Sequence, residues 1–300
     1  MTQVLGRSVV VGIDGSVASR NATEWAAAEA QRRSLPLRII HAWSIPLPPI
    51  AMGPTVQGPS DEQLRDAAQL VLDRAVTAAT KAYPAVEIVG LLQAGQPTFV
   101  LLEASDDALV IAVGASGLDS FTECLLGSIT TQIVTHAPCP VAVVGAEQQQ
   151  DTDGPDVGKV VVGIDGSELS IDAAHAGFEA ASLRGVGLTL LHAWHSPAYV
   201  ATRFAIPQPF ALEEAQQEEL RAMAESVAGF QQTYPDVVVE QRLVQGKAAK
   251  VLAEASRGAE LVVVGTRGHG GFARLLLGST SNSLLHHAQC PVLVVRPGTL

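Results

Sequence analysis

Two glycine-rich motifs in the chain have the composition and spacing to hold phosphate groups. In each motif, two glycines are separated by two residues, and a Gly-Ser pair follows after nine more. The first motif consists of Gly114, Gly117, Gly127 and Ser128. The second, 151 positions later, consists of Gly265, Gly268, Gly278 and Ser279. Glycine lets the backbone approach a ligand closely or adopt a positive φ. Each motif follows an apolar run typical of a strand, and each Gly-Ser precedes a run typical of a helix. Because strand, glycine loop and helix N-terminus together bind phosphate through backbone N–H groups, the sequence predicts two nucleotide sites.

An acidic residue follows the first apolar run of each half. Asp14 stands in Gly12-Ile-Asp-Gly-Ser, and Asp165 stands in the matching segment that begins at Gly163. A carboxylate at this point can accept hydrogen bonds from a base amino group or from ribose hydroxyls, or help to position a metal. It can also cap the helix that follows. Since the aspartates and the glycine motifs converge at strand ends, we expect contact with the ligand, alongside any capping.

Neither glycine motif matches the common phosphate-loop patterns. Neither copy contains G-x-x-x-x-G-K-[ST], so the motif is not a Walker A loop, and neither contains G-x-G-x-x-G, which disfavours a dinucleotide. The glycines also have a purely structural interpretation, in which they make tight turns and the serines Ser128 and Ser279 cap helices. The repetition of one spacing in both halves favours ligand binding.

The duplication extends along the whole chain at the same offset. His41-Ala-Trp43 recurs as His192-Ala-Trp194, and Cys139-Pro-Val recurs as Cys290-Pro-Val. A constant offset of this length indicates a duplicated domain and not a short-period solenoid. We predict a first domain at 1–146, a polar linker at 147–158 and a second domain at 159–300.

Strands and helices alternate in the predicted elements. In the first half, strands are expected at 9–13, 37–42, 86–91, 109–113 and 141–144, and helices at 16–33, from 60 onward, at 97–104 and at 128–137. This order predicts an α/β fold with a parallel sheet covered by helices on both faces. Such sheets bind ligands beyond the carboxyl ends of their strands. The last strands, 141–144 and 292–295, are apolar enough to pair with each other across the two domains.

Composition restricts the classes of partner and the cellular compartment. The net charge of −11 over 300 residues argues against nucleic acid or an anionic membrane as a general partner. The three cysteines form no C-x-x-C pair, so neither a disulfide framework nor a zinc site is indicated. A strand begins almost at the N-terminus, which leaves no room for a signal peptide, and no apolar run approaches the roughly 20 residues of a membrane span. We therefore expect a cytoplasmic protein.

Taken together, these motifs resemble a tandem universal stress protein of the ATP-binding subgroup, nearly end to end in both halves. The resemblance implies two doubly wound, five-stranded parallel-sheet domains, similar to Rossmann and adenine nucleotide alpha hydrolase folds and paired as an internal pseudo-dimer. It also implies ATP, with or without Mg²⁺, across the strand tips. The residues expected to bind it are Gly12, Asp14, Ala42, Gly114, Gly117, Gly127, Ser128 and Ile129 in the first half and Gly163, Asp165, Ala193, Gly265, Arg267, Gly268, Gly278, Ser279 and Thr280 in the second.

The two predicted sites differ in charge between their glycines. The second loop includes Arg267 and Arg274, whereas the first includes Asp119 and Glu123. A partly exposed carboxylate near phosphate costs on the order of 1 kcal/mol. We expect the second site to bind ATP more tightly, the alternative being that these side chains point into solvent.

Two classes of function compete for these sites. The first is a nucleotide-dependent sensor or regulator in stress or growth arrest, acting on an unidentified protein partner as a homodimer of tandem chains. The alternative is a slow ATPase or adenylate-transferring enzyme of the same fold, and a third reading is a scaffold that has lost its nucleotide. The chain lacks a HIGH-type motif and a Ser-Gly-Gly phosphate loop, which favours binding over catalysis.

Other residue types with chemical potential fit structural roles better. His41 and His192 are expected to be hydrogen-bonded core-edge histidines, and His286-His287 lacks a third ligand for zinc. Cys139 and Cys290 precede proline at strand entrances, where packing is favoured over redox sensing. The proline-rich segment 45–59 fits either a lid over the nucleotide or a plain loop.

Overall fold

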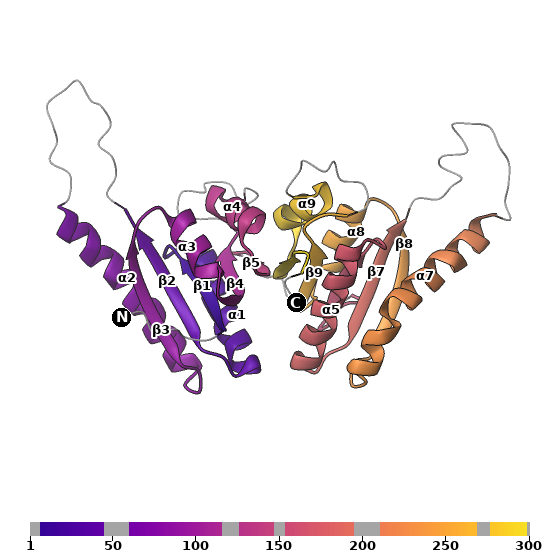
Figure 1. The fold of residues 1–300 in the computed structure, drawn as a ribbon, viewed down its shortest axis with the longest axis horizontal. Coiled ribbons are helices and arrows are strands. Elements are labelled where there is room, and N and C mark those ends of the chain that lie inside the picture. Colours follow the sequence, from indigo (N-terminus) through magenta and orange to yellow (C-terminus); the bar gives the residue numbers. More distant parts are fainter. Residues whose placement is uncertain are drawn as a thin grey trace, which may run out of the picture. The chain divides into compact units, whose positions relative to one another are not determined.

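The chain divides into two compact units in the computed structural model, Met1–Cys139 and Pro140–Leu300 (Figure 1). The structure describes residues 7–44, 60–115, 126–146, 154–194, 211–268 and 277–298. Each unit is an α/β assembly and is described by itself.

The first unit contains a parallel sheet with the strand order β3-β2-β1-β4. Its elements are β1 (Ser8–Ile13), α1 (Val17–Arg33), β2 (Leu37–Trp43), α2 (Asp61–Ala82), β3 (Ile88–Ala94), α3 (Pro97–Ser105), β4 (Ala108–Gly114) and α4 (Ser128–His136). Strand β3 begins two residues later than predicted, because Val86 lies in a turn closed by its N–H to the Tyr83 carbonyl (3.1 Å). The strand then continues to Ala94, which pairs with Trp43.

The second unit repeats this arrangement and adds a strand from the first repeat. Its elements are β5 (Val141–Val144), β6 (Val160–Ile164), α5 (Glu168–Arg184), β7 (Leu188–Trp194), α7 (Ala211–Thr233), β8 (Val239–Gln245), α8 (Ala248–Ala255), β9 (Leu261–Gly265), α9 (Ser279–His287) and β10 (Val292–Val295). The strand order is β5-β10-β9-β6-β7-β8. The five strands β6–β10 are parallel, as predicted, and β5 pairs antiparallel with β10, with Val143 opposite Val292. The predicted pairing of the two last strands is therefore confirmed.

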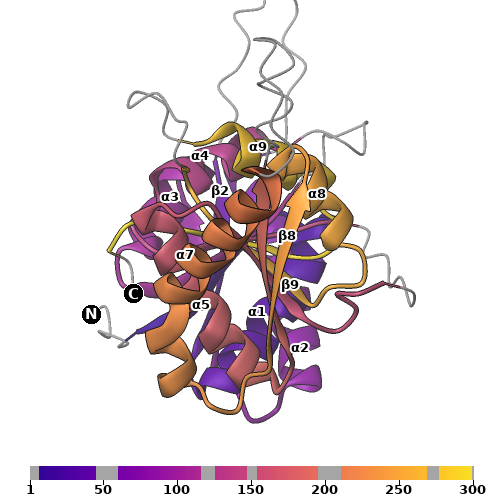
Figure 2. The same ribbon diagram turned by 90° about the vertical axis from the view of Figure 1, so that its right-hand side faces the viewer.

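The helices cover both faces of each sheet, which explains why the central strands are apolar throughout. Val9, Val10 and Val11 of β1 and the matching valines of β6 are fully buried. Helices α1 and α2 pack together on one face of the first sheet, and α3 and α4 pack together on the other. Figure 2 shows the same division in the second unit, where α5 and α7 lie together on one side of the strands and α8 on the other.

Local sequence signals determine where the helices begin. Ser16 and Ser167 are the N-caps of α1 and α5, and each side chain accepts a hydrogen bond from the backbone N–H three residues on. Ser60 and Gln63 form the predicted capping box at the start of α2. Helices α1 and α5 thus start directly after β1 and β6, which places Asp14 and Asp165 in the short connections between strand and helix.

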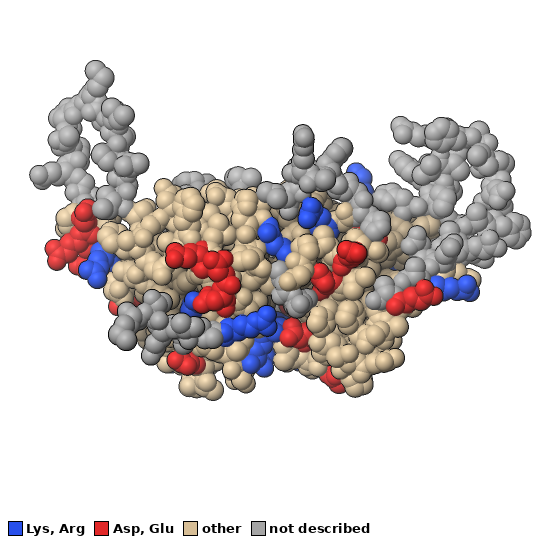
Figure 3. All heavy atoms as spheres, in the orientation of Figure 1, with Lys and Arg blue, Asp and Glu red and all other residues tan. Residues whose placement is uncertain are grey.

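Charged residues at the start of α2 lie in solvent. Asp61, Glu62, Arg65 and Asp66 are all exposed, and Figure 3 shows acidic and basic side chains adjacent to one another at this end of the helix, at the upper left of the view. Mixed charges on an exposed helix face favour solubility and do not form a site. In the described ranges, none of the helices has both the length and the apolar character that crossing a membrane requires.

Burial should make the described cysteines unreactive. Cys139 and Cys290 are 5% and 8% exposed, and burial raises the pKa of the Cys290 thiol to about 12. Because only the thiolate attacks disulfide reagents, we expect no reaction of these two thiols with dithionitrobenzoate at pH 8 in the native protein. A Cys124→Ser background removes the third thiol, which lies outside the described residues. In that background, two thiols should react only after denaturation; rapid labelling of the native protein would contradict the packing role.

Candidate functional site

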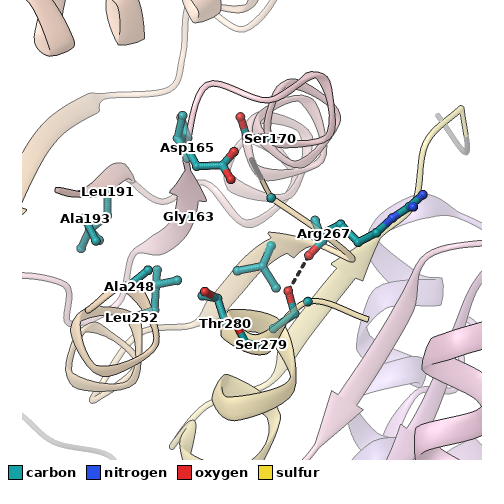
Figure 4. Close-up of a pocket in the computed structure, with 16 residues that line it drawn as sticks. Gly163, Asp165, Ser170, Leu191, Ala193, Ala248, Leu252, Arg267, Ser279 and Thr280 are labelled. Atoms are coloured by element: carbon teal, nitrogen blue, oxygen red, sulfur yellow. Dashed lines mark hydrogen bonds between the residues drawn. The ribbon is translucent and has the colours of Figure 1, made fainter. Parts of the chain in front are cut away.

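A pocket of about 430 Å³ lies at the carboxyl ends of β6, β7 and β9 in the second unit (Figure 4). Its lining residues are Gly163, Ile164, Asp165, Ser170, Leu191, Ala193, Ala248, Leu252, Val264, Gly265, Arg267, Gly268, Gly278, Ser279, Thr280 and Ser281. The chain order of the strands reverses on either side of β6, which is where a sheet of this type opens a crevice. All nine residues expected to bind ATP in the second half are among the lining residues.

The first turn of α9 forms one side of this pocket. The N-cap is Gly278, and not Ser279 as the capping interpretation expected; Ser279 is the first helical residue. The physical reason is that the Gly278 carbonyl accepts the first helical hydrogen bond, from Asn282 N–H at 2.9 Å. Gly127 takes the same position in α4, so the same correction applies to Ser128. A glycine N-cap has no side chain to offer, and the N–H groups of the first turn have no intrahelical partner.

Asp165 lies opposite this helix end and has a structural role as well. Its Oδ1 accepts hydrogen bonds from the Ser167 backbone N–H (3.1 Å) and from the Ser167 hydroxyl (2.6 Å). These contacts hold the turn at Gly166, whose φ is +81°. Asp14 accepts in the same way from Ser16 N–H (2.9 Å). Figure 4 shows the Asp165 carboxylate among the pocket's lining residues, so turn formation and exposure to the pocket coexist in one side chain.

The two glycines that open the second motif meet different neighbours. A Cβ on Gly265 would lie 3.2 Å from Leu169 Cβ and 3.2 Å from the Arg267 carbonyl oxygen. Gly114, its counterpart, would place a Cβ 2.9 Å from Ala18 Cβ. Both contacts to Cβ arise from close packing of the strand end on the first helix of the same repeat, α1 for Gly114 and α5 for Gly265. A Cβ on Gly268 would instead overlap Asp165 Oδ2. The first glycine therefore has a packing role, whereas Gly268 keeps space beside the carboxylate.

Hydroxyl groups at one repeated position connect the helix start to the strand end. Ser281 Oγ donates to the Gly265 carbonyl and Thr130 Oγ1 donates to the Gly114 carbonyl, each at 2.7 Å. Sequence reasoning missed both residues. The available signal was a hydroxyl side chain at the same place in each repeat, three positions after the Gly that precedes the helix.

The apolar part of the pocket was also missed. Leu191 comes from β7, Val264 from β9, and Ala248 and Leu252 from one face of α8. The α8 residues belong to neither motif, and their spacing of four is that of any helix with one buried face. Only the fold brings them beside Asp165 (Figure 4).

Arg267 lines the pocket, but its charged end points elsewhere. In Figure 4 the guanidinium extends away from Asp165 and Thr280. The remaining residues of the charge comparison, Arg274, Asp119 and Glu123, lie outside the described residues, as does Gly117. Within the described part, the two helix starts also differ at their second helical residue, because Thr280 of α9 corresponds to Ile129 of α4, which is 36% exposed.

The first unit brings its own predicted residues to equivalent places. Gly12, Asp14, Ala42 and Gly114 lie in or directly after β1, β2 and β4, and Gly127, Ser128 and Ile129 start α4. Gly127 N–H donates to the Ala115 carbonyl at 2.8 Å, and Gly278 N–H donates to Thr266 at 2.7 Å in the same manner. In the described residues, the strand ends and the helix start of the two repeats therefore follow the same backbone pattern.

The strand-end histidines have backbone partners. Nδ1 of His41 lies 2.7 Å from the Ile13 carbonyl, and Nδ1 of His192 lies 2.7 Å from the Ile164 carbonyl. Since a carbonyl only accepts, each Nδ1 carries the proton. These contacts join the end of the second strand of each repeat to the end of the first, the role that the sequence suggested.

Comparison with known proteins finds matches to one protein family for each repeat and for the whole chain. The sequence profile of the Universal stress protein family matches residues 6–145 and 157–296. Universal stress protein Rv2005c of Mycobacterium tuberculosis is 37% identical over 294 residues, which cover 96% of this chain and 96% of the relative. Universal stress protein Rv2623 of the same organism is 36% identical over 296 residues, with the same coverage of both chains.

A solved structure has the same architecture. The crystal structure of a universal stress protein from Archaeoglobus fulgidus matches with a TM-score of 0.69 and 18% identity, over 97% of this chain and 98% of that chain. This likeness concerns the fold, and the profile matches and the mycobacterial relatives concern the family. The resemblance noted from the motifs is confirmed, and the chain belongs to the universal stress protein family, with two family domains in tandem.

Proposed function

We propose that the pocket of the second unit binds ATP and that the protein is a nucleotide-dependent regulator in stress or growth arrest. The observation on which this depends is the start of α9, a helix N-terminus without a side-chain cap, facing Asp165 across a cavity of about 430 Å³. Cavities of roughly 300–1,000 Å³ are the usual size for small ligands. The arrangement offers separate places for phosphates, ribose and base.

Phosphates belong at the start of α9. The aligned peptide dipoles give this end a partial positive charge, and the first-turn N–H groups can donate to phosphate oxygens. Ser279 and Thr280 add hydroxyl donors, and both line the pocket. Gly278 allows close approach, because no side chain projects from the N-cap.

Ribose and base belong on the opposite side. The negative charge of Asp165 repels phosphate but accepts hydrogen bonds from ribose hydroxyls or from a base amino group. Leu191, Ala193, Ala248 and Leu252 provide an apolar surface beside it for a planar base. The charges of the pocket therefore favour one orientation of ATP, with its triphosphate toward α9.

Mg²⁺ would be coordinated more by the nucleotide than by the protein. This ion takes few protein ligands and prefers carboxylate and phosphate oxygens with water. Among the described lining residues, Asp165 supplies the one carboxylate. Mg²⁺, where bound, would be held mainly by phosphate oxygens and water.

We further propose a weaker ATP site in the first unit, formed by Gly12, Asp14, Ala42, Gly114, Gly117, Gly127, Ser128 and Ile129. The repeated turn, helix start and strand ends support it, and the apolar Ile129 in the place of Thr280 makes it the poorer phosphate site.

The regulator would act in the cytoplasm on a protein partner, as a homodimer of tandem chains. Slow ATP hydrolysis or adenylate transfer is the alternative. Intact ATP released from denatured protein would favour the regulator, and ADP with measurable turnover would favour the enzyme.

Removing the charge of Asp165 should weaken ATP binding at the second site. Asp165→Asn keeps an oxygen that can accept from Ser167, so the turn is retained, but the carboxylate's charge-assisted hydrogen bonds to ribose or base are lost. We expect an affinity loss of about 10- to 100-fold by isothermal titration, the equivalent of about 1.5–3 kcal/mol. Asp14→Asn is the matched control and should alter only the weaker site. An unchanged tight site in Asp165→Asn would refute the proposed role.

Exchanging the second helical residue between α9 and α4 should alter the contribution of the phosphates to ATP affinity and no other part of it. Thr280→Ile gives α9 the residue found in α4, and Ile129→Thr makes the reverse change. We expect Thr280→Ile to weaken ATP binding roughly tenfold, since one hydrogen bond to a charged group is lost. Adenosine is the control ligand, because it has no phosphate, and its affinity should stay the same. Equal losses for ATP and adenosine would mean that Thr280 does not contact phosphate.

A further inference from the structure

A second cavity, of about 440 Å³, lies in the first unit and is lined mainly by residues of α1 and α2. Its walls are formed by Ile13, Gly15, Ser19, Arg20, Thr23, Glu24, Val71, Arg74, Ala75, Ala78, Ala79, Ala82 and Tyr83. Four alanines of α2 follow one another at helical spacing, 75, 78, 79 and 82, and make one wall low and apolar. None of the residues expected to bind ATP lines this cavity.

In the second repeat, aromatic side chains occupy the corresponding space between α5 and α7. His175 and Phe230 stack with ring centroids 5.2 Å apart and an angle of 9° between planes. Phe178 lies 5.6 Å from Phe230 and 6.0 Å from Tyr234. This cluster of four residues joins the two helices and is called the aromatic cluster below.

Most of these rings are missing from the first repeat. At the offset of 151, His175, Phe178 and Phe230 of the aromatic cluster correspond to Glu24, Ala27 and Ala79; only the fourth ring is kept, as Tyr83. Ala79 is 5% exposed and Ala27 is fully buried. Glu24 and Ala79 line the cavity together with Tyr83, so the open space between α1 and α2 coincides with the loss of the rings of His175 and Phe230.

Two cations accompany this loss of rings. Arg20 and Arg74 line the cavity, whereas their counterparts in the second repeat are Ile171 and Glu225. Arg20 Nη1 donates to the Gly15 carbonyl at 2.9 Å, which fixes the arginine at one end of the cavity. In a chain with a net charge of −11, two arginines at one cavity, against the single acid Glu24, indicate an anionic ligand.

The remaining ring adds a polar group. Burial raises the pKa of the Tyr83 hydroxyl, and the nearby Glu24 carboxylate raises it further. At neutral pH this hydroxyl is therefore a hydrogen-bond donor and acceptor. The cavity combines an apolar wall, one aromatic face, one hydroxyl and two guanidinium groups.

We propose that this cavity binds a small aromatic carboxylate. The ring of the ligand would take the space that Phe230 fills in the second repeat, against Ala75 and Ala79 and beside Tyr83. The carboxylate would pair with Arg20 and Arg74, because guanidinium groups match carboxylate geometry. The second repeat thus supplies an internal comparison, in which the protein's own rings occupy the site and the cations are absent.

The test uses 2-naphthoate as the probe and the full-length protein, with binding followed by isothermal titration and ligand-observed NMR. Ala79→Phe restores the ring of the second repeat and should lower 2-naphthoate affinity at least about tenfold. Arg74→Gln should lower 2-naphthoate affinity about tenfold but leave the uncharged analogue 2-naphthalenemethanol unaffected. ATP affinity should not change in either variant, and it serves together with thermal melting as the check on folding.

Variants in the second repeat provide the matched control. Phe230→Ala opens the aromatic cluster without adding a cation, so it should admit 2-naphthalenemethanol and not 2-naphthoate. If Ala79→Phe does not fold, the proposal is still tested by comparing the affinities of 2-naphthoate and 2-naphthalenemethanol for Arg74→Gln. The proposal is overturned if 2-naphthoate does not bind, if its binding is unchanged in Arg74→Gln, or if octanoate, an aliphatic acid, binds more tightly.

Discussion

The passage from the first strand to the first helix, made within three residues in each repeat, is the constraint on which the site depends. Asp165 accepts from the backbone N–H and hydroxyl of Ser167, and Gly166 turns with a φ of +81°. The protein's own hydrogen bonds thereby fix an acidic group at the strand tip. The glycine at 268 then passes close to that carboxylate, and the start of α9 lies on the opposite side of the pocket. The hydrogen bonds that form the turn therefore also fix the position of Asp165 in the pocket.

The duplication made most of the fold predictable from sequence. Apolar runs in one repeat could be checked against the other, and the capping box at Ser60 is a short-range signal that depends on four residues alone. The pocket's glycines and aspartate were found for the same reason. The structural interpretation of the motifs expects Ser128 and Ser279 as N-caps instead of Gly127 and Gly278, because serine is a usual N-cap and only the backbone hydrogen bonds show which carbonyl begins the helix.

Features formed by distant residues were not predictable. The apolar surface from α8 depends on elements that approach only in the folded chain. The cavity between α1 and α2 is harder still, because missing side-chain volume is not a motif. The contrast between the repeats marks it, since Ala79 lines the cavity where Phe230 stands in the aromatic cluster of the second repeat. The two repeats have kept one backbone and diverged in how the space between their helices is filled.

The antiparallel pairing of β5 with β10 has a consequence for how the chain can be divided. Strand β5 belongs to the first repeat in sequence, yet it completes the hydrogen bonding of β10 in the second unit. A fragment that begins at the linker would leave the outer side of β10 as a bare, apolar edge. Such an edge can recruit the same strand from another molecule, so cutting between the repeats would favour strand exchange and aggregation over an independent monomeric domain.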